Sequence, residues 1–122
     1  MNYYHVSETN CNKKTFKPRV PHSIMDQEDS RTKRVCFSTN IRGCLKAIDI
    51  ELFLNFGDDE YFVHVPNNYS GKIYKPSVSE VPDVKDTREK WLLNRVNLKC
   101  IGKIKVYKSK RNKFIYKWIE KY

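Results

Sequence analysis

The chain has few glycines, no long apolar run and none of the common catalytic signatures. Only four of its 122 residues are glycine, and neither Gly-x-Gly-x-x-Gly nor a Gly-Lys-Ser phosphate loop occurs. Gly-x-Ser-x-Gly and His-Glu-x-x-His are absent as well. No stretch approaches the roughly 18 apolar residues of a membrane-spanning helix, and residues 1–10 lack the apolar centre of a secretion signal. The composition predicts a soluble, cytoplasmic protein.

The cysteines give little support to a metal site. Cys11, Cys36, Cys44 and Cys100 are scattered, with no Cys-x-x-Cys pair, whereas structural zinc sites need closely spaced ligands. Two disulfides are the alternative for an even number of cysteines. However, Cys36 and Cys44 lie in apolar periodic segments, where a free thiol packs well. We expect reduced thiols and no bound metal.

What the chain does have is aromatic residues, which argue for a folded domain. It contains 2 Trp, 8 Tyr and 6 Phe, large side chains that disordered sequences usually lack. A length of 122 residues fits one domain, since domains cluster at roughly 100–150 residues. We therefore predict a single domain spanning residues 1–122.

Positive charge is concentrated near the C-terminus. The formal net charge is +10, yet residues 95–122 hold ten Lys and Arg against one acid, Glu120. Residues 1–94 are thus nearly neutral. A local excess of this kind predicts one positive surface that faces an anionic partner, with a solvated lysine-rich face as the alternative. We treat residues 95–122 as a basic β segment of the same domain.

In the N-terminal half the pattern predicts two short strands and a helix. Residues 3–7 are β-prone and lead into a polar segment. Residues 16–34 hold too much proline and charge for a regular element and predict a long loop. A strand at 34–37 follows. Apolar residues at 41, 44, 45 and 48 have helical spacing, and Ser38 or Thr39 is placed to cap that helix.

The C-terminal half is predicted to form most of the sheet. Strands are expected at residues 61–65, 90–96 and 99–107, with a loop containing Gly71, Pro76 and Pro82 between the first two. Residues 113–122 alternate as a strand does but also suit one face of a helix; we favour a strand because aromatic residues are enriched there. The fold class is thus α+β, with a mixed, mostly antiparallel sheet and one or two helices.

Three short motifs occur in an order that resembles ADP-ribosyltransferase-like domains. They are residues 4–7 (Tyr-His-Val-Ser), residues 37–39 (Phe-Ser-Thr) ahead of the helix, and residues 87–89 (Thr-Arg-Glu) leading into Trp91. The layout covers residues 3–107, although only about a dozen positions carry it. The chain is also similar to small proteins of phages and prophages.

The resemblance implies an ADP-ribosyltransferase-like fold with NAD, or a related ADP-ribose nucleotide, as ligand. In that family a first-strand histidine holds a ribose hydroxyl, a role that falls on His5. The second motif shapes the nicotinamide pocket and corresponds to Ser38 and Thr39. The third-motif glutamate corresponds to Glu89. A carboxylate beside the ribose lowers the barrier to glycosidic cleavage, because positive charge develops on the sugar.

Further residues complete and qualify this set. Arg19 and Arg34 are the nearest candidates for the pyrophosphate, since a guanidinium matches phosphate oxygens. Thr87 stands where many members have Glu or Gln to activate the acceptor, so the acceptor is left open. Four of these residues also have a purely structural interpretation: helix capping for Ser38 and Thr39, a surface ion pair for Glu89, and hydrogen bonding in the core or at the surface for His5.

Two classes of function follow from these features. The first is an ADP-ribosyltransferase-like protein that binds NAD and modifies a macromolecular acceptor, plausibly a phage counter-defence factor in the host cytoplasm. The second is a non-catalytic basic protein that binds nucleic acid or a nucleic-acid-handling enzyme; a third variant sequesters a signal derived from NAD. For the second class, the basic residues expected to bind the partner are Lys103, Lys105, Lys108, Lys110, Arg111, Lys113 and Lys117.

Overall fold

The computed structural model describes residues 2–20, 32–47, 59–75, 89–108 and 114–122. Within these ranges the chain forms mostly antiparallel sheets with one short helix, an α+β arrangement. The elements are β1 (His5–Ser7), β2 (Thr15–Phe16), β3 (Val35–Ser38), α1 (Ile41–Ala47), β4 (Asp59–Asn67), β5 (Ile73–Tyr74), β6 (Glu89–Leu92), β7 (Val96–Lys108) and β8 (Phe114–Lys121).

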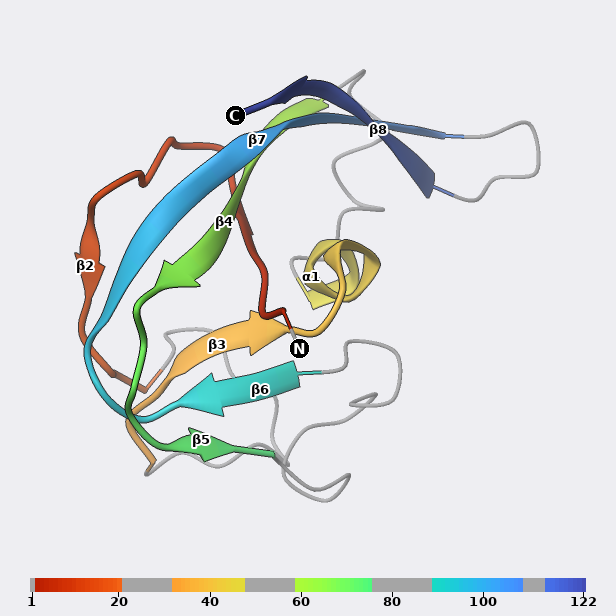
Figure 1. The fold of residues 1–122 in the computed structure, drawn as a ribbon. Coiled ribbons are helices and arrows are strands. Elements are labelled where there is room, and N and C mark those ends of the chain that lie inside the picture. The colour runs from red at the N-terminus through yellow and green to blue at the C-terminus, as the bar shows by residue number, and fades with distance from the viewer. Residues whose placement is uncertain (1, 21–31, 48–58, 76–88, 109–113) are drawn as a thin grey trace.

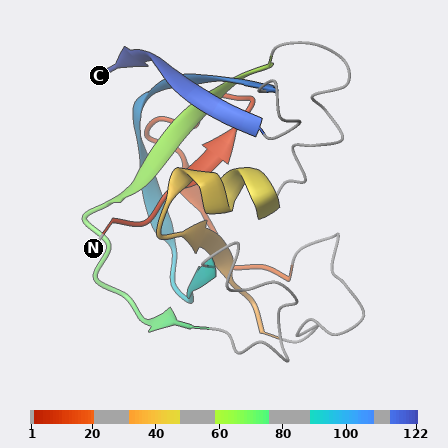
Figure 2. The ribbon, with the colours of Figure 1, turned by 90° about the vertical axis from the view of Figure 1, so that its right-hand side faces the viewer.

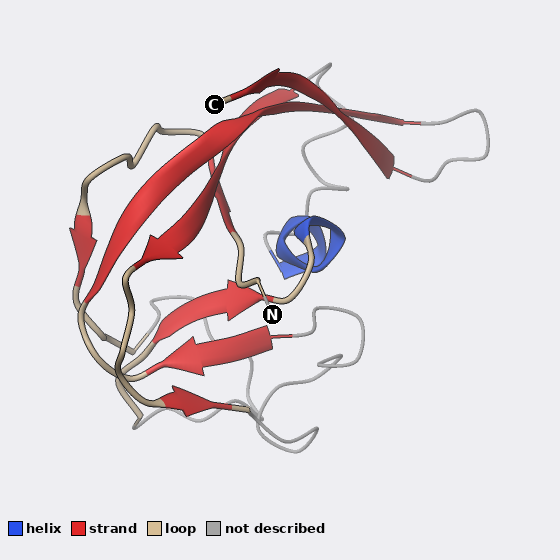
Figure 3. Cartoon of the chain, in the orientation of Figure 1, coloured by secondary structure: helices blue, strands red, loops and turns tan. Residues whose placement is uncertain are grey.

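The strands form two antiparallel sheets. The larger has the order β1-β4-β7-β2, with β8 paired to β7, and the smaller has the order β3-β6-β5. Figures 1 and 3 show the larger sheet curving over the smaller one. Two isolated backbone bridges join the sheets, Tyr4 to Ser38 and Arg19 to Arg34. These bridges connect the region around β3 to Tyr4, just before β1, and to Arg19, after β2.

Apolar side chains form two core clusters, one on each side of β1. The first lies under α1 and combines Leu45 with Val6, Val63 and Ile104. The second lies between the two sheets and contains Phe37, Leu92, Val96 and Leu98. Because alternate residues of a strand point to opposite faces, β1 contributes Val6 to the first cluster and presents its neighbours to the other side.

The helix begins at Ile41 and is capped by Asn40. The Asn40 Oδ1 atom accepts a hydrogen bond from the Gly43 backbone N–H at 2.6 Å, which is the geometry of an N-cap side chain. Ser38 or Thr39 was expected in this role, and that expectation is wrong: the Ser38 hydroxyl accepts instead from the Asn40 N–H at 3.3 Å. Figure 2 shows α1 between β8 above and β3 below.

The longest strand, β7, bends at a glycine. Its pairing with β4 shifts register between Val63 and His64, where Val63 pairs with Gly102 and His64 with Cys100. Gly102 has φ of 155°, a backbone conformation that L side chains rarely adopt. A Cβ at this position would lie 2.7 Å from the Trp118 ring. Gly102 thus permits both the bulge and the close approach of β8.

The sequence located most elements but missed two short strands. The strands expected near residues 3–7, 34–37, 61–65 and 99–107 are present, and the alternating segment 113–122 contains the strand β8. The strand expected over 90–96 is wrong at its end, because β6 of the smaller sheet ends at Leu92 and the chain enters the larger sheet as β7 at Val96. β2 and β5 are two residues long, too short to give a periodic pattern. Ile48 lies outside the described residues.

Candidate functional site

Most of the residues expected to hold a nucleotide lie on one face of the smaller sheet. Ser38 pairs directly with Glu89 across β3 and β6, and such partners share a face. Arg34 precedes Ser38 by four residues and therefore has the same orientation. Arg19 lies across from Arg34 in a backbone bridge. We call this surface, with Cys36 and Trp91, the Arg34 face.

Trp91 occupies the centre of the Arg34 face. The Arg34 guanidinium lies 3.9 Å from the centre of the indole ring, a cation–π contact. The indole Nε1–H donates a hydrogen bond to Glu89 Oε2 at 2.9 Å. Tyr74 of β5 packs on the same indole, with ring centroids 5.4 Å apart. Trp91 thus holds a cation and a carboxylate in fixed positions on one surface.

Accessibility differs among these residues. Ser38 is 3% exposed, Arg34 is 2% exposed and Trp91 is fully buried, while Glu89 is half-buried and Arg19 is exposed. The Arg34 Nη1 also donates to the Thr32 carbonyl oxygen at 2.9 Å. The accessible groups of the Arg34 face are therefore a carboxylate and a guanidinium at opposite ends of β3.

His5 lies on the other side of the sheet. Tyr4, not His5, shares the face of Ser38, because Tyr4 and Ser38 are bridge partners. The His5 ring contacts Phe37 and Phe16, with centroid distances of 6.0 and 5.2 Å, and Phe37 belongs to the cluster between the sheets. The structure thus does not bring His5 together with Ser38 and Glu89 around one ligand.

His5 instead forms a pair with His64, which the sequence did not single out. The two Nδ1 atoms are 3.4 Å apart. The Cys11 backbone N–H donates to His64 Nε2 at 2.9 Å, so in neutral His64 the proton is on Nδ1. That proton faces the His5 carbonyl oxygen at 3.3 Å and the His5 Nδ1. Register is the signal that identifies the pair, since His5 lies opposite His64 in the β1–β4 ladder.

Burial keeps both imidazoles neutral. It lowers the pKa of His5 from 6.5 to about 4, with repulsion from His64 as the smaller cause. Burial also lowers the pKa of His64, against a smaller opposing effect of its hydrogen bond to His5. A charged imidazole loses hydration in an apolar interior, so the pair is uncharged at neutral pH and serves as a neutral hydrogen-bond relay between β1, β4 and residue 11.

Thr39, which was expected at the nicotinamide pocket with Ser38, does not belong to the Arg34 face. It follows Ser38 in the turn before α1 and is half-buried. The cap role belongs to Asn40, and Thr39 lies outside β3 and the Arg34 face.

A second surface carries partly or fully exposed lysines and half-buried aromatic rings. On β7 the even-numbered residues Ile104 and Val106 are buried, so their odd-numbered neighbours point outward. Across the ladders, Lys105 pairs with Lys117 of β8, and Phe62 of β4 pairs with Lys103. The outward residues of these strands define a surface that we call the lysine face: Phe62, Lys103, Lys105, Tyr107 and Lys117.

The rings on the lysine face lie beneath cationic side chains. Lys103 Nζ is 5.4 Å from the centre of the Phe62 ring, and Lys117 Nζ is 5.9 Å from that of Tyr107. Both rings are half-buried. Bases of single-stranded nucleic acid stack on exposed aromatic rings while nearby lysines contact phosphates. In the Lys103–Phe62 and Lys117–Tyr107 pairs a lysine lies next to a ring, which is the arrangement that this mode of binding uses.

Two glutamates reduce the charge of this surface. Glu60 lies across from Lys105, and Glu120 across from Lys103; Lys103 Nζ is 3.5 Å from Glu60 Oε2. Exposed ion pairs of this kind contribute little to stability. The charge excess on the lysine face is therefore smaller than the sequence count suggests.

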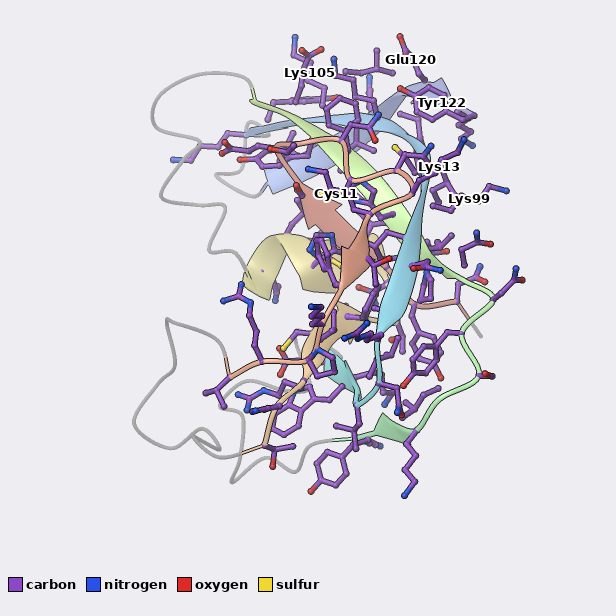
Figure 4. The ribbon with its side chains drawn as sticks, turned by 90° about the vertical axis from the view of Figure 1, so that its left-hand side faces the viewer. Cys11, Lys13, Lys99, Lys105, Glu120 and Tyr122 are labelled. Atoms are coloured by element: carbon purple, nitrogen blue, oxygen red, sulfur yellow. The ribbon has the colours of Figure 1, made fainter. Side chains whose placement is uncertain are left out.

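The remaining basic residues fall into two groups, one outside the described residues and one beside the larger sheet. Lys110, Arg111 and Lys113 connect β7 to β8 and lie outside the described residues. Lys13 and Lys99 lie near one another beside the larger sheet, below Glu120 and Tyr122 (Figure 4), and the Lys13 N–H donates to the Leu98 carbonyl oxygen at 2.8 Å. The sequence did not place Lys13 with the C-terminal lysines, because 80 or more residues separate them.

A polar cavity lies at the opposite end of β7. It has a volume of about 430 Å³, within the range of roughly 300–1,000 Å³ of small-molecule sites. It is formed by the connection between β4 and β5, the connection between β6 and β7, and β2. Its lining contains Thr15, Asn67, Asn68, Tyr69, Ser70, Gly71, Asn94, Arg95, Val96 and Asn97.

Among the described residues no group of three or more potential ligands could hold a metal ion, and the four cysteines are thiols. Burial raises the pKa of Cys44 to about 12.

None of the helices in the described ranges is long and apolar enough to cross a membrane. Comparison of the chain with protein-family models, with curated proteins and with solved structures gave no match.

Proposed function

We propose that the protein binds single-stranded nucleic acid through the lysine face. The observation that carries the proposal is the common orientation of Lys103, Lys105 and Lys117 with two aromatic rings. Lysines contact phosphates without reading sequence, and rings stack on any base. Binding of this kind is electrostatic and tolerant of sequence.

The test is the affinity for a fluorescent single-stranded oligonucleotide, measured by anisotropy at several salt concentrations. Each phosphate neutralised on a single strand contributes about −0.7 to the slope of log K against log salt. Replacing Lys105 and Lys117 by Gln should weaken binding roughly tenfold at low salt and reduce the slope by about 1.4.

The matched control replaces Lys33 and Lys46 by Gln. Both are exposed, they lie on other elements, and their loss changes the net charge equally. The control should bind as the native protein does. Equal weakening by both double variants would assign binding to net charge alone, and the absence of binding at low salt would exclude the proposal.

A second candidate, binding of NAD or an ADP-ribose nucleotide, is supported by the shared orientation of Arg19, Arg34, Ser38 and Glu89. Four residues of β3 span about 13 Å, so a guanidinium and a carboxylate are held at a separation suited to an extended dinucleotide. An ADP-ribosyltransferase-like activity would use Glu89 beside the ribose and Arg19 at the pyrophosphate, with Arg34 held against Trp91. His5, on the other side of the sheet, has no part in this version.

Calorimetric titration with NAD tests the second candidate. Glu89→Gln and Arg19→Gln should each reduce the affinity at least tenfold, while Glu60→Gln, which removes a glutamate from the other sheet, should not. His5→Phe should leave binding unchanged. No heat of binding with the native protein would exclude the candidate, and an equal effect of Glu60→Gln would remove the Arg34 face as its location.

A further inference from the structure

The polar cavity at the end of β7 has the chemistry of a binding site for a phosphorylated sugar. Its lining offers the side-chain amides of four asparagines and the hydroxyls of threonine, serine and tyrosine. Each amide carries donors and an acceptor, and each hydroxyl acts as both. The sole aliphatic side chain of the lining is Val96, which is almost fully buried. Such a surface matches a ligand that is polar on all sides.

One charge in the lining determines which polar ligand fits. Arg95 is exposed, and none of the described residues that line the cavity with it is acidic. Its guanidinium presents two parallel N–H groups, which match the oxygens of a phosphate. A neutral sugar would offer no anionic group to the Arg95 guanidinium. Inorganic phosphate would offer no hydroxyl groups to the asparagine amides.

The wall of the cavity is held in place before any ligand binds. The Tyr69 hydroxyl donates to the Lys72 carbonyl oxygen at 2.5 Å and accepts from the Asn94 N–H at 3.3 Å. Asn94 Oδ1 accepts from the Lys72 N–H at 3.0 Å. These bonds join the two connections that form the cavity, which lie side by side in Figure 1. A pre-organised site loses less entropy on binding.

Gly71 permits this close approach. A Cβ at position 71 would lie 2.6 Å from the Tyr69 hydroxyl oxygen and 2.7 Å from the Asn94 Cβ. Across the opening, the Thr15 hydroxyl donates to Asn97 Oδ1 at 2.5 Å. Thr15 and Asn97 are cross-strand partners on β2 and β7, so the far wall is part of the sheet. Rigid strands and a braced connection thus enclose the space.

We infer that this cavity binds a small polyhydroxylated phosphate ester, with Arg95 on the phosphate and the asparagine amides on the sugar hydroxyls. This site is separate from the lysine face and from the Arg34 face. It accounts for a concentration of asparagines that neither proposed function uses: Asn67, Asn68, Asn94 and Asn97.

The test is titration calorimetry of the full chain with glucose 6-phosphate, glucose and inorganic phosphate. Saturable binding of glucose 6-phosphate at least tenfold tighter than that of either other compound is expected. Arg95→Gln should weaken it at least tenfold. Lys99→Gln is the matched control, because it removes one exposed charge from β7, four residues after Arg95 and outside the lining, and it should have no effect.

Three outcomes would overturn the inference: no saturable binding of the ester, binding of glucose or phosphate as tight as that of the ester, or equal weakening by Arg95→Gln and Lys99→Gln. Circular dichroism of each variant separates loss of binding from loss of folding. The lysine-face variants leave Arg95 intact, so failure of nucleic-acid binding and failure of this site are distinguished by separate proteins and separate ligands.

Discussion

At the scale of single residues, the contact between His5 and His64 determines how the interior responds to acid. Both imidazoles are held neutral by burial, and His64 accepts a hydrogen bond from the Cys11 backbone N–H. Protonation of His64 at Nε2 would replace that acceptor by a donor. Protonation of His64 would therefore remove the hydrogen bond that holds the backbone of Cys11 against β4.

Stability should fall as the solution is acidified through the range set by His5. Its pKa in the folded chain is about 4 instead of 6.5, so the unfolded chain binds a proton first. The stabilising contribution is complete above pH 6.5 and declines as the pH falls toward 4. The difference amounts to about 3 kcal/mol in total.

Urea unfolding at pH 7 and pH 4.5 measures this effect. His5→Phe keeps a ring against Phe16 and Phe37 but removes the titration, so it should lose about 2–3 kcal/mol less than the native protein between the two pH values. Carboxylates titrate in both proteins and cancel in the comparison. Identical losses would show that His5 is not held neutral by the fold.

At the scale of elements, the sequence predicted the helix α1 correctly but its N-cap residue incorrectly. The spacing of Ile41, Cys44 and Leu45 predicted the helix, and these side chains are buried in the first core cluster. The choice among Ser38, Thr39 and Asn40 was not set by propensity, since all three are good caps. β3 decided it: Ser38 is the last residue of the strand and pairs with Glu89, which leaves Asn40 at the helix start.

Replacing Asn40 by Ala should lower the free energy of unfolding by about 1 kcal/mol, because the Gly43 N–H loses its acceptor. Asn40→Ser should retain most of the stability. Thr39→Ala is the informative comparison, with an expected change within about 0.5 kcal/mol. Chemical denaturation of the three variants checks this, and a larger loss for Thr39→Ala than for Asn40→Ala would contradict the assigned cap.

At the scale of the whole molecule, the two sheets share a core and are expected to unfold together. Phe37 and Leu92 of the smaller sheet pack with Val96 and Leu98 of the larger one. The bridge between Tyr4 and Ser38 adds backbone hydrogen bonds of 2.7 and 3.0 Å between the sheets. The second core cluster therefore needs both sheets, and small single domains usually unfold in one step.

The two tryptophans report on this cooperativity, because Trp91 lies on β6 and Trp118 on β8. In Trp118→Phe, the fluorescence of Trp91 should follow the same denaturation curve as far-ultraviolet circular dichroism, which is dominated by the longer strands of the larger sheet. Two separated midpoints would show that the sheets are independent units.

The candidate sites show the same division between local and tertiary information. Lys103 and Lys105 share a face because alternate residues of β7 point the same way, whereas Phe62 joins them only through register with Lys103. For the nucleotide set, sequence order placed His5 with Ser38 and Glu89, but the antiparallel pairing of Tyr4 with Ser38 turned His5 to the opposite side. A shift of one residue reverses the side on which a strand residue lies, and no motif encodes that shift.

The sequence by itself determined most of the strands, the helix and the basic C-terminal segment, because periodicity and charge are properties of neighbouring residues. Only the tertiary structure decided the His5–His64 pair, the contact of Arg34 with Trp91, and the asparagine-lined cavity beside Arg95. Each of these joins positions that are remote in sequence or lie in connections between strands. Their proximity results from strand register and from packing of the two sheets, which depend on the whole chain at once.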